Sequence, residues 1–304
     1  MEKLIVIAGA TASGKSAAAL RLARERGGEI ISADSMQVYR RMDVGTAKPT
    51  AAERAAVPHH MIDPCEPNEP YSLADWVSEA RRVIADVQGR GALPIVCGGT
   101  GLYIDTLIDG TSLSEAAGDA AIRAELTERA GREGAHALWS ELSAVDPGSA
   151  EAIHENNVRR VIRALEIFRA TGVTKSEWDR RSRSAAPPYD VRYFVIEWSP
   201  RALLYDRIDR RVDGMFAAGL EAEARALWDE GALTPDSVGG QAIGYKELVP
   251  YFRGEITLGE AAEAIKQATR RYAKRQETWF RRRADAIRVA GENAAEEILR
   301  LALS

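Results

Sequence analysis

The residues best suited to chemistry lie near the start of the chain, where one run fits the pattern G-x-x-x-x-G-K-[ST]. An apolar run at 4–8 precedes it and a helix-favouring run at 17–23 follows, which predicts a strand, a glycine loop and a helix. In that setting backbone amides and the helix N-terminus bind phosphate, Lys15 neutralises phosphate oxygens, and the Ser16 hydroxyl ligates Mg²⁺. The residues of the loop are Gly9, Ala10, Thr11, Ala12, Ser13, Gly14, Lys15 and Ser16.

A carboxylate is predicted to lie beside this loop. Residues 29–33 have the composition of a second strand, and Asp34 follows directly. Because ligands gather at the carboxyl ends of parallel strands, we expect Asp34 to be a catalytic group. The alternative role for an aspartate at a strand-to-helix turn is that of a helix N-cap.

A third strand is predicted at 93–97, ending in Gly98-Gly99-Thr100-Gly101. We expect this second glycine loop, with the Thr100 hydroxyl, to face the phosphates from the other side, although such a run is weak by itself. The pair His59 and His60 suggests a metal, but no third and fourth ligand follow at a usable spacing. A structural loop is therefore expected there.

The totals describe an ordinary globular protein: 304 residues, 45% hydrophobic and 28% charged. The sequence contains no apolar run of about 18 residues, so we expect no membrane partner. The first strand begins near Met1, which leaves no room for a signal peptide. The two cysteines, Cys65 and Cys97, suit a reducing cytoplasm, and Cys97 is expected in the core.

The order of these segments predicts an α/β fold: a P-loop NTPase-like parallel sheet flanked by helices, with an inserted all-helical domain. The core is expected at 1–111 and 187–304 and the insertion at 112–186. Helices are predicted within the insertion at 120–131, 134–145 and 157–171, and the chain returns to a strand at 192–198.

Basic residues are concentrated in three places, although the net charge is −4. Between residues 266 and 283 there are eight basic side chains and one acid, which indicates either a nucleic-acid surface or a solvated helix face. Arg159 and Arg163 share a helix face suited to phosphates or to acids such as Glu166. Arg207 and Arg211 are also one turn apart, with a surface ion-pair ladder as the alternative.

Taken together, the segments resemble one family, the tRNA dimethylallyltransferases, also called tRNA isopentenyltransferases. The run from Ser32 to Arg40, Ser-Ala-Asp-Ser-Met-Gln-Val-Tyr-Arg, is far more specific than the phosphate loop. The sequence departs from the family at Ala10, where proline is usual, at Asn157, where an acid is common, and over 112–121. The matching segments are 9–16, 32–40, 45–49, 59–63, 98–103, 159–166, 207–215, 243–245 and 267–276.

The resemblance implies transfer of a dimethylallyl group from its diphosphate to N6 of the adenosine immediately 3′ of the anticodon in tRNA. It implies that Asp34 takes the N6 proton, that Thr100 faces the bridging oxygen, and that Lys15 and Arg211 hold the departing diphosphate with residues 9–16 and Mg²⁺. A monomer is expected. The implied tRNA contacts are Asp34, Ser35, Met36, Gln37, Arg123, Arg159, Arg160, Val161, Ile162, Arg163, Gln241, Gly244, Tyr245, Lys274, Arg275 and Gln276.

Three other functions use the same motifs. A nucleotide kinase or other phosphoryl transferase would bind ATP in the same loop, with Asp34 on Mg²⁺. A non-catalytic NTPase would bind tRNA without transferring a prenyl group. A prenyltransferase acting on free adenine nucleotides would need neither the arginine face of the insertion nor the basic C-terminal helix.

Overall fold

The computed structural model describes residues 3–110, 119–182, 188–234 and 237–302. Within these ranges the chain forms two compact units, one comprising residues up to 108 and from 189, and the other residues 109–188. The expected boundaries at 112 and 186 lie outside the described residues. Each unit has its own hydrophobic core.

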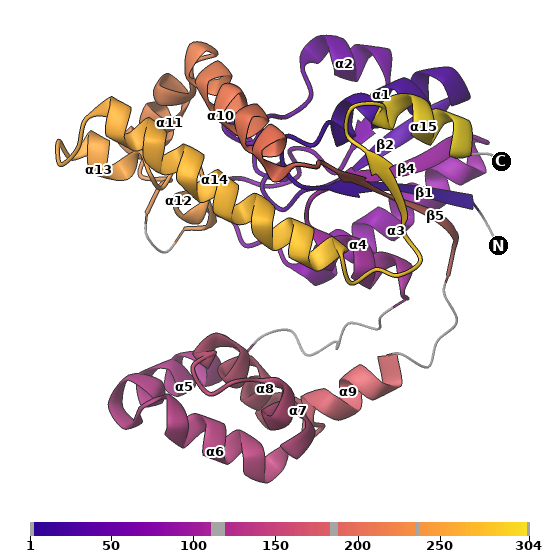
Figure 1. Cartoon of the computed structure of the whole chain (residues 1–304). Helices are drawn as coiled ribbons and strands as arrows, with labels where there is room; N and C mark the ends of the chain where they lie inside the picture. The colour runs from indigo at the N-terminus through magenta and orange to yellow at the C-terminus, as the bar shows by residue number, and fades with distance from the viewer. Residues whose placement is uncertain (1–2, 111–118, 183–187, 235–236, 303–304) are drawn as a thin grey trace. The chain divides into compact units, whose positions relative to one another are not determined.

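The larger unit is built on a parallel sheet, which has six strands among the described residues, in the order β3-β2-β4-β1-β5-β6 (Figure 1). The predicted α/β fold is therefore confirmed. The strands are β1 (Lys3–Gly9), β2 (Gly28–Ala33), β3 (His59–His60), β4 (Leu93–Gly98), β5 (Asp190–Glu197) and β6 (Ile287–Ala290).

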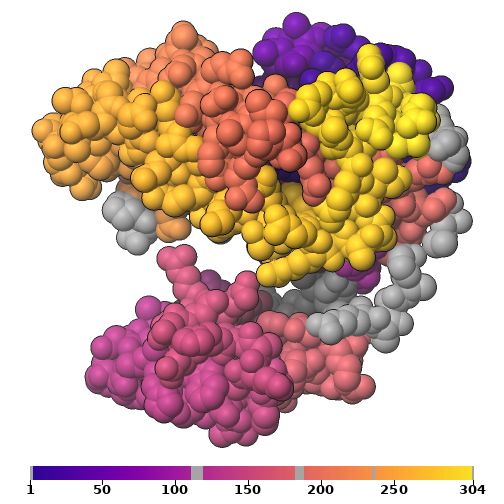
Figure 2. Space-filling model, viewed as in Figure 1, coloured from indigo at the N-terminus to yellow at the C-terminus, as the bar shows by residue number. Residues whose placement is uncertain are grey.

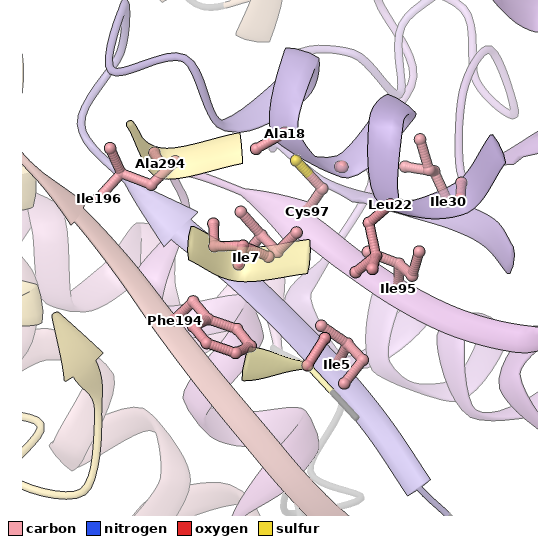
Figure 3. Packing of buried hydrophobic residues seen from close by; sticks show 14 of the residues in the cluster. Ile5, Ile7, Ala18, Leu22, Ile30, Ile95, Cys97, Phe194, Ile196 and Ala294 are labelled. Atoms are coloured by element: carbon pink, nitrogen blue, oxygen red, sulfur yellow. The ribbon is translucent and has the colours of Figure 1, made fainter. Parts of the chain in front are cut away.

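Helices cover both faces of this sheet, because successive strand side chains point to opposite faces. Ile5 and Ile7 of β1 pack under α1 and α15, with Phe194 of β5 beside them (Figure 3). The helices α3 and α4 contact β2 and β4, and Figure 1 shows them on the opposite face from α1 and α15. Their bounds are α1 (Lys15–Arg26), α3 (Leu73–Gly89), α4 (Gly101–Ile108) and α15 (Ala294–Leu301).

The C-terminal part of the larger unit, coloured orange to yellow, forms much of the surface seen in Figure 2. The long helix α14 begins after Thr257, whose side chain forms a capping box with Glu260. α14 packs against α10, α13, α4 and β1. The remaining elements here are α2 (Ala51–Ala56), α10 (Arg201–Ala217), α11 (Leu220–Asp229), α12 (Val238–Gln241), α13 (Val249–Phe252) and α14 (Leu258–Phe280).

The smaller unit is helical throughout its described residues, as the sequence predicts. Its core is formed by leucines of three helices, including Leu126, Leu138 and Leu165, none of which is exposed. The sequence did not predict its two short helices, α7 and α9. The bounds are α5 (Ala120–Glu133), α6 (Ala135–Val145), α7 (Pro147–Ala152), α8 (Val158–Thr171) and α9 (Lys175–Ser182).

The structure differs from the predicted strands at both edges of the sheet. His59 and His60, expected in a loop, form strand β3, which pairs with Ile30 and Ile31 of β2. His60 Nε2 lies 2.6 Å from Glu29 of β2, so this histidine contributes to the edge of the sheet. Strand β6 was not predicted, because its four residues give too short a pattern.

Candidate active site at the phosphate loop

The loop between β1 and α1 has the backbone geometry that its glycines allow. Gly14, directly before the helix, has φ +99°, a left-handed conformation that favours glycine. At Gly9 a Cβ would lie 2.8 Å from Ser13 Oγ and 3.1 Å from the Ile196 carbonyl oxygen. The loop is therefore folded tightly against the end of β5.

Amides of this loop and of the first turn of α1 are free to bind an anion. The N–H groups of Ala12, Gly14, Lys15 and Ser16 make no hydrogen bond to another described residue. Free amides at a helix N-terminus, together with the helix dipole, form an anion site. Fewer loop amides are available for an anion than the sequence predicts. The Thr11 amide donates to Gln276 Oε1 at 2.8 Å, and the Ser13 amide donates to the Ala10 carbonyl at 3.2 Å.

A cavity of about 300 Å³ opens at this loop, and Lys15, Asp34 and Arg211 all line it. Burial lowers the pKa of Lys15, and Arg211 acts in the same direction, while Cys97 and Asp34 oppose it. Burial also lowers the pKa of Arg211, against the influence of Asp34. Two cations and one carboxylate thus share a half-buried space. An anionic ligand bound there would stabilise the charged forms of Lys15 and Arg211.

Asp34 directly follows β2, as predicted, and no helix begins there, so it is not a helix N-cap. Its Oδ1 accepts a hydrogen bond from the Met36 amide at 2.9 Å, which fixes the turn. Its side chain also lines the cavity, together with Ser35, Met36 and Gln37. The second carboxylate oxygen has no hydrogen bond to another described residue and can accept one from a ligand.

Gln37 is held by its own protein rather than left free to read a base. Its Oε1 accepts from the Ser32 hydroxyl at 2.8 Å, and its Nε2 donates to the carbonyls of Thr46 and Ala47, each at 3.2 Å. Both amide protons are therefore engaged. The Oε1 atom keeps one lone pair, so Gln37 can only accept a hydrogen bond from a ligand.

The second glycine loop packs against α14, and its role toward the phosphates stays a prediction. A Cβ at Gly99 would lie 2.2 Å from Gln276 Nε2, and one at Gly101 would lie 2.2 Å from the Trp279 ring. These glycines therefore permit the close approach of α14. The Thr100 hydroxyl accepts from the Ser35 amide at 3.1 Å and does not line the cavity, which makes Thr100 a support for the Asp34 turn.

Sequence reasoning missed Glu223, on α11, which holds one wall of the cavity. Its carboxylate accepts from the amides of Asp43, Val44 and Gly45 at 2.8–3.0 Å and from the Tyr245 hydroxyl at 2.6 Å. No pattern in the sequence marks it, because α11 contains several acids. The Tyr245 ring is fully buried, and a tRNA contact at this position stays a prediction.

The neighbouring residues Gln241 and Gly244 do line the cavity, as does Arg275 of α14. The other two α14 residues predicted to bind tRNA differ from each other: Lys274 is exposed, whereas Gln276 is only 5% exposed. The Gln276 carboxamide accepts from the Thr11 amide and donates to the Gly99 carbonyl, so this side chain is bound within the protein rather than exposed at the surface.

The predicted arginines of the helical unit separate into two pairs. Arg123 and Arg163 lie within ion-pair distance of Glu166, whose side chain is 1% exposed. Arg159 and Arg160 are exposed, and neither forms an ion pair with another described residue. The side chains of Val161 and Ile162 belong to the core of this unit, and their contact with tRNA stays a prediction.

The donor set at the loop fits Mg²⁺. The Ser16 hydroxyl is exposed and borders the same cavity as the Asp34 carboxylate. The described residues contain no group of three or more His, Cys, Asp or Glu side chains arranged for a metal. Mg²⁺ prefers oxygen ligands and completes its shell with waters and substrate phosphates, so a hydroxyl and a carboxylate oxygen are suitable donors for it.

In the described part of the chain, no helix combines the length and the apolar character needed to cross a bilayer.

The fold and the loop define the class of protein: a P-loop α/β core with a cavity at the carboxyl edge of its sheet. Two family models match, one described as IPP transferase over residues 37–283 and one as isopentenyl transferase over residues 2–63. The chain belongs to the IPP transferase family.

Relatives and solved structures agree with this assignment. The tRNA dimethylallyltransferase of Geobacillus thermodenitrificans is 50% identical over 92% of this chain and 88% of its own length. The full-length tRNA isopentenylpyrophosphate transferase of Bacillus halodurans has TM-score 0.72 and 44% identity, over 99% of this chain and 95% of that one. A eukaryotic dimethylallyltransferase acting on tRNA has TM-score 0.83 and 31% identity, over 96% of this chain and 74% of that one.

Proposed function

We propose that this protein transfers a dimethylallyl group from dimethylallyl diphosphate to N6 of the adenosine immediately 3′ of the anticodon in tRNA, with release of diphosphate. The observation that carries the proposal is one cavity in which an anion site, Lys15 and Arg211 lie with the Asp34 carboxylate. Membership of the IPP transferase family supports it.

The chemistry explains why these groups occur together. The N6 lone pair of adenine is delocalised into the ring, so the allylic C–O bond must be largely broken as nitrogen attacks. The electron pair of that bond leaves with the diphosphate, which the free loop amides, Lys15 and Arg211 stabilise. Ser16 would hold Mg²⁺, which would supply positive charge to neutralise the departing diphosphate.

The acceptor side of the reaction depends on Asp34. As the new C–N bond forms, N6 becomes positively charged and loses a proton to the carboxylate. The free carboxylate oxygen of Asp34 is available for this hydrogen bond, because only Oδ1 is engaged by Met36. The adenine must leave its stack to reach the cavity, which costs least in a single-stranded loop.

Recognition of tRNA is proposed for two exposed basic surfaces. On α14 the side chains of Arg271, Lys274 and Arg275 are exposed and form no ion pair with described residues, in contrast to Lys266 and Arg270. In the helical unit, Arg159 and Arg160 are exposed in the same way. Such residues neutralise backbone phosphates and release counterions.

The proposal also covers the cellular location and the oligomeric state of the protein. We propose that the protein works in the cytoplasm, in keeping with its free cysteines Cys65 and Cys97. We also propose that it acts as a monomer, because the cavity is lined within one unit of a single chain.

The test is mass analysis of nucleosides from a tRNA transcript incubated with the protein, Mg²⁺ and dimethylallyl diphosphate. We expect one dimethylallyl adenosine, at the position 3′ of the anticodon. AMP replaces tRNA in a second arm, and ATP replaces the allyl diphosphate in a third. Prenylated AMP at a comparable rate, or phosphate transfer from ATP without prenyl transfer, would contradict the proposal.

A further inference from the structure

Gln276 is a buried polar side chain near the C-terminal end of α14, directly after two exposed basic residues. Its side chain is 5% exposed, whereas Lys274 and Arg275 beside it face solvent. A buried carboxamide without partners would destabilise the fold, so its hydrogen bonds indicate its role.

Both ends of this carboxamide are bound to the backbone of loops that meet at the cavity. The Thr11 amide donates to Oε1 at 2.8 Å, and Nε2 donates to the Gly99 carbonyl at 2.9 Å. Thr11 belongs to the phosphate loop, 265 positions away in sequence. Gln276 therefore joins the phosphate loop and the loop after β4 to one side chain of α14.

The residues packed around Gln276 allow this bridge and hold α14 beside it. A Cβ at Gly99 would lie 2.2 Å from Nε2, so only glycine lets the carboxamide approach the carbonyl. One turn away, Ala273 packs without exposure against Ala10 and Ala12 of the phosphate loop. On the other side, Trp279 Nε1 donates to Asp105 of α4 at 2.7 Å, which holds this end of α14 in place.

We propose that Gln276 is a positioning residue for the phosphate loop: its carboxamide fixes the Thr11 amide against the Gly99 carbonyl, and thereby sets the geometry in which the neighbouring free amides receive a diphosphate. The proposal rests on the proposed function for the identity of the ligand, but not for the bridge itself. It replaces the predicted tRNA contact of Gln276, because the hydrogen bonds of its side chain are already formed within the protein.

The experiment measures binding of inorganic diphosphate by calorimetry, with Mg²⁺ and without RNA, in the full-length chain. Q276A removes both hydrogen bonds, and we expect binding about tenfold weaker than in the unsubstituted protein. Q276M, which keeps most of the side-chain volume, provides the same test if Q276A does not fold. The matched control is Q267A, an exposed glutamine of the same helix, for which no change is expected.

A second variant examines the bridge from its other end. In G99A the added Cβ displaces the Gln276 carboxamide, so diphosphate binding should weaken as in Q276A. In the double variant Q276A/G99A the alanine at 276 leaves room for that Cβ, and the two effects should not add. Fully additive effects would show that the two residues act separately and would overturn the proposal.

The final measurement separates positioning of the loop from contact with RNA. Affinity for an anticodon stem-loop RNA should stay within about twofold in Q276A, because the exposed basic residues are retained. In turnover, the KM for the allyl diphosphate should rise while the KM for RNA stays unchanged. Unchanged diphosphate binding, or a loss confined to RNA affinity, would overturn the assignment. Absence of prenyl transfer in the unsubstituted protein would instead contradict only the proposed function.

Discussion

At the scale of single residues, Asp34 and Lys15 act on different reactants of the proposed reaction: Asp34 on the adenine and Lys15 on the diphosphate. Asp34 lies at the end of β2 with one carboxylate oxygen left for a ligand. Lys15 lies at the start of α1, where burial already lowers its pKa and a phosphate would restore the preference for the charged form. Substitutions at the two positions should therefore give different kinetic results.

For Asp34→Asn we expect turnover to fall about 100-fold or more, because the carboxamide cannot take the N6 proton. Affinity for tRNA should change little, since the side chain keeps its shape and its acceptor for the Met36 amide. Single-turnover rates and filter binding measure the two quantities. Asp86→Asn, on the exposed side of α3, is the control. Normal turnover in Asp34→Asn would exclude Asp34 as the base.

For Lys15→Ala we expect weaker diphosphate binding together with reduced turnover, because the charge nearest the free amides is lost. Calorimetry with inorganic diphosphate measures the first effect and initial rates measure the second. Lys3→Ala, at the exposed start of β1, should change neither. Diphosphate affinity equal to that of the unsubstituted protein would contradict the role given to this lysine.

Removal of Mg²⁺ with a chelator should reduce both diphosphate affinity and turnover, and added Mg²⁺ should restore them. Ser16→Ala should need a higher Mg²⁺ concentration for half-maximal activity, because it lacks the hydroxyl proposed as ligand. A titration of activity against Mg²⁺ compares this variant with Ser143→Ala, in the helical unit. Identical titration curves for all three proteins would contradict a metal at Ser16.

At the scale of elements, the wall of the cavity formed by residues 43–47 is held from α11. Glu223 accepts hydrogen bonds from three consecutive backbone amides of this segment. The Tyr245 ring packs closely against Gly45, where an added Cβ would lie 2.5 Å from the ring. The carbonyls of Thr46 and Ala47 in turn fix the amide of Gln37. One carboxylate therefore determines the orientation of a side chain that lines the cavity.

Glu223→Gln should disturb this wall, because a neutral carboxamide accepts charge-assisted hydrogen bonds less strongly than a carboxylate. We expect kcat/KM for tRNA to fall about tenfold, with diphosphate binding unchanged because the phosphate loop is held by other contacts. Glu221→Gln, two residues earlier on α11, is the control. Equal losses for diphosphate and tRNA would indicate general loosening of the fold instead.

At the scale of the whole molecule, the net charge of −4 conceals an uneven distribution. Lys266 and Arg270 of α14 are neutralised by Asp213 and Asp209 of α10, which joins the two helices. The exposed side chains of Arg271, Lys274 and Arg275 keep their charge for a partner. Nucleic-acid binding by an acidic protein thus depends on which basic residues lack internal partners.

Replacing Arg271, Lys274 and Arg275 together by glutamine should weaken tRNA binding and lower the slope of log K against log salt concentration by about two. Thermal stability should stay near that of the unsubstituted protein, because these charges have no internal ion pairs. The control removes the same number of exposed arginines elsewhere in the larger unit. An unchanged salt slope would show that α14 does not contact phosphates. The control residues are Arg24, Arg26 and Arg81.

Local sequence patterns determined the phosphate loop, the four central strands and most of the long helices. These features depend on neighbouring residues: a glycine pattern after an apolar run, helical periodicity, and an aspartate at a strand end. The short elements β3, β6, α7 and α9 could not be predicted, because a few residues carry too little periodicity and their stability comes from packing.

The roles of polar side chains were decided only by the tertiary structure. Gln276 and Glu223 look like free surface groups in the sequence, yet each one is bound to the backbone of a distant segment. Arg123 of α5 pairs with the buried Glu166 of α8, 43 positions away, and only the fold brings these two residues together. A hydrogen bond or ion pair depends on distances between parts of the chain that are far apart in sequence, and only the folded structure fixes those distances.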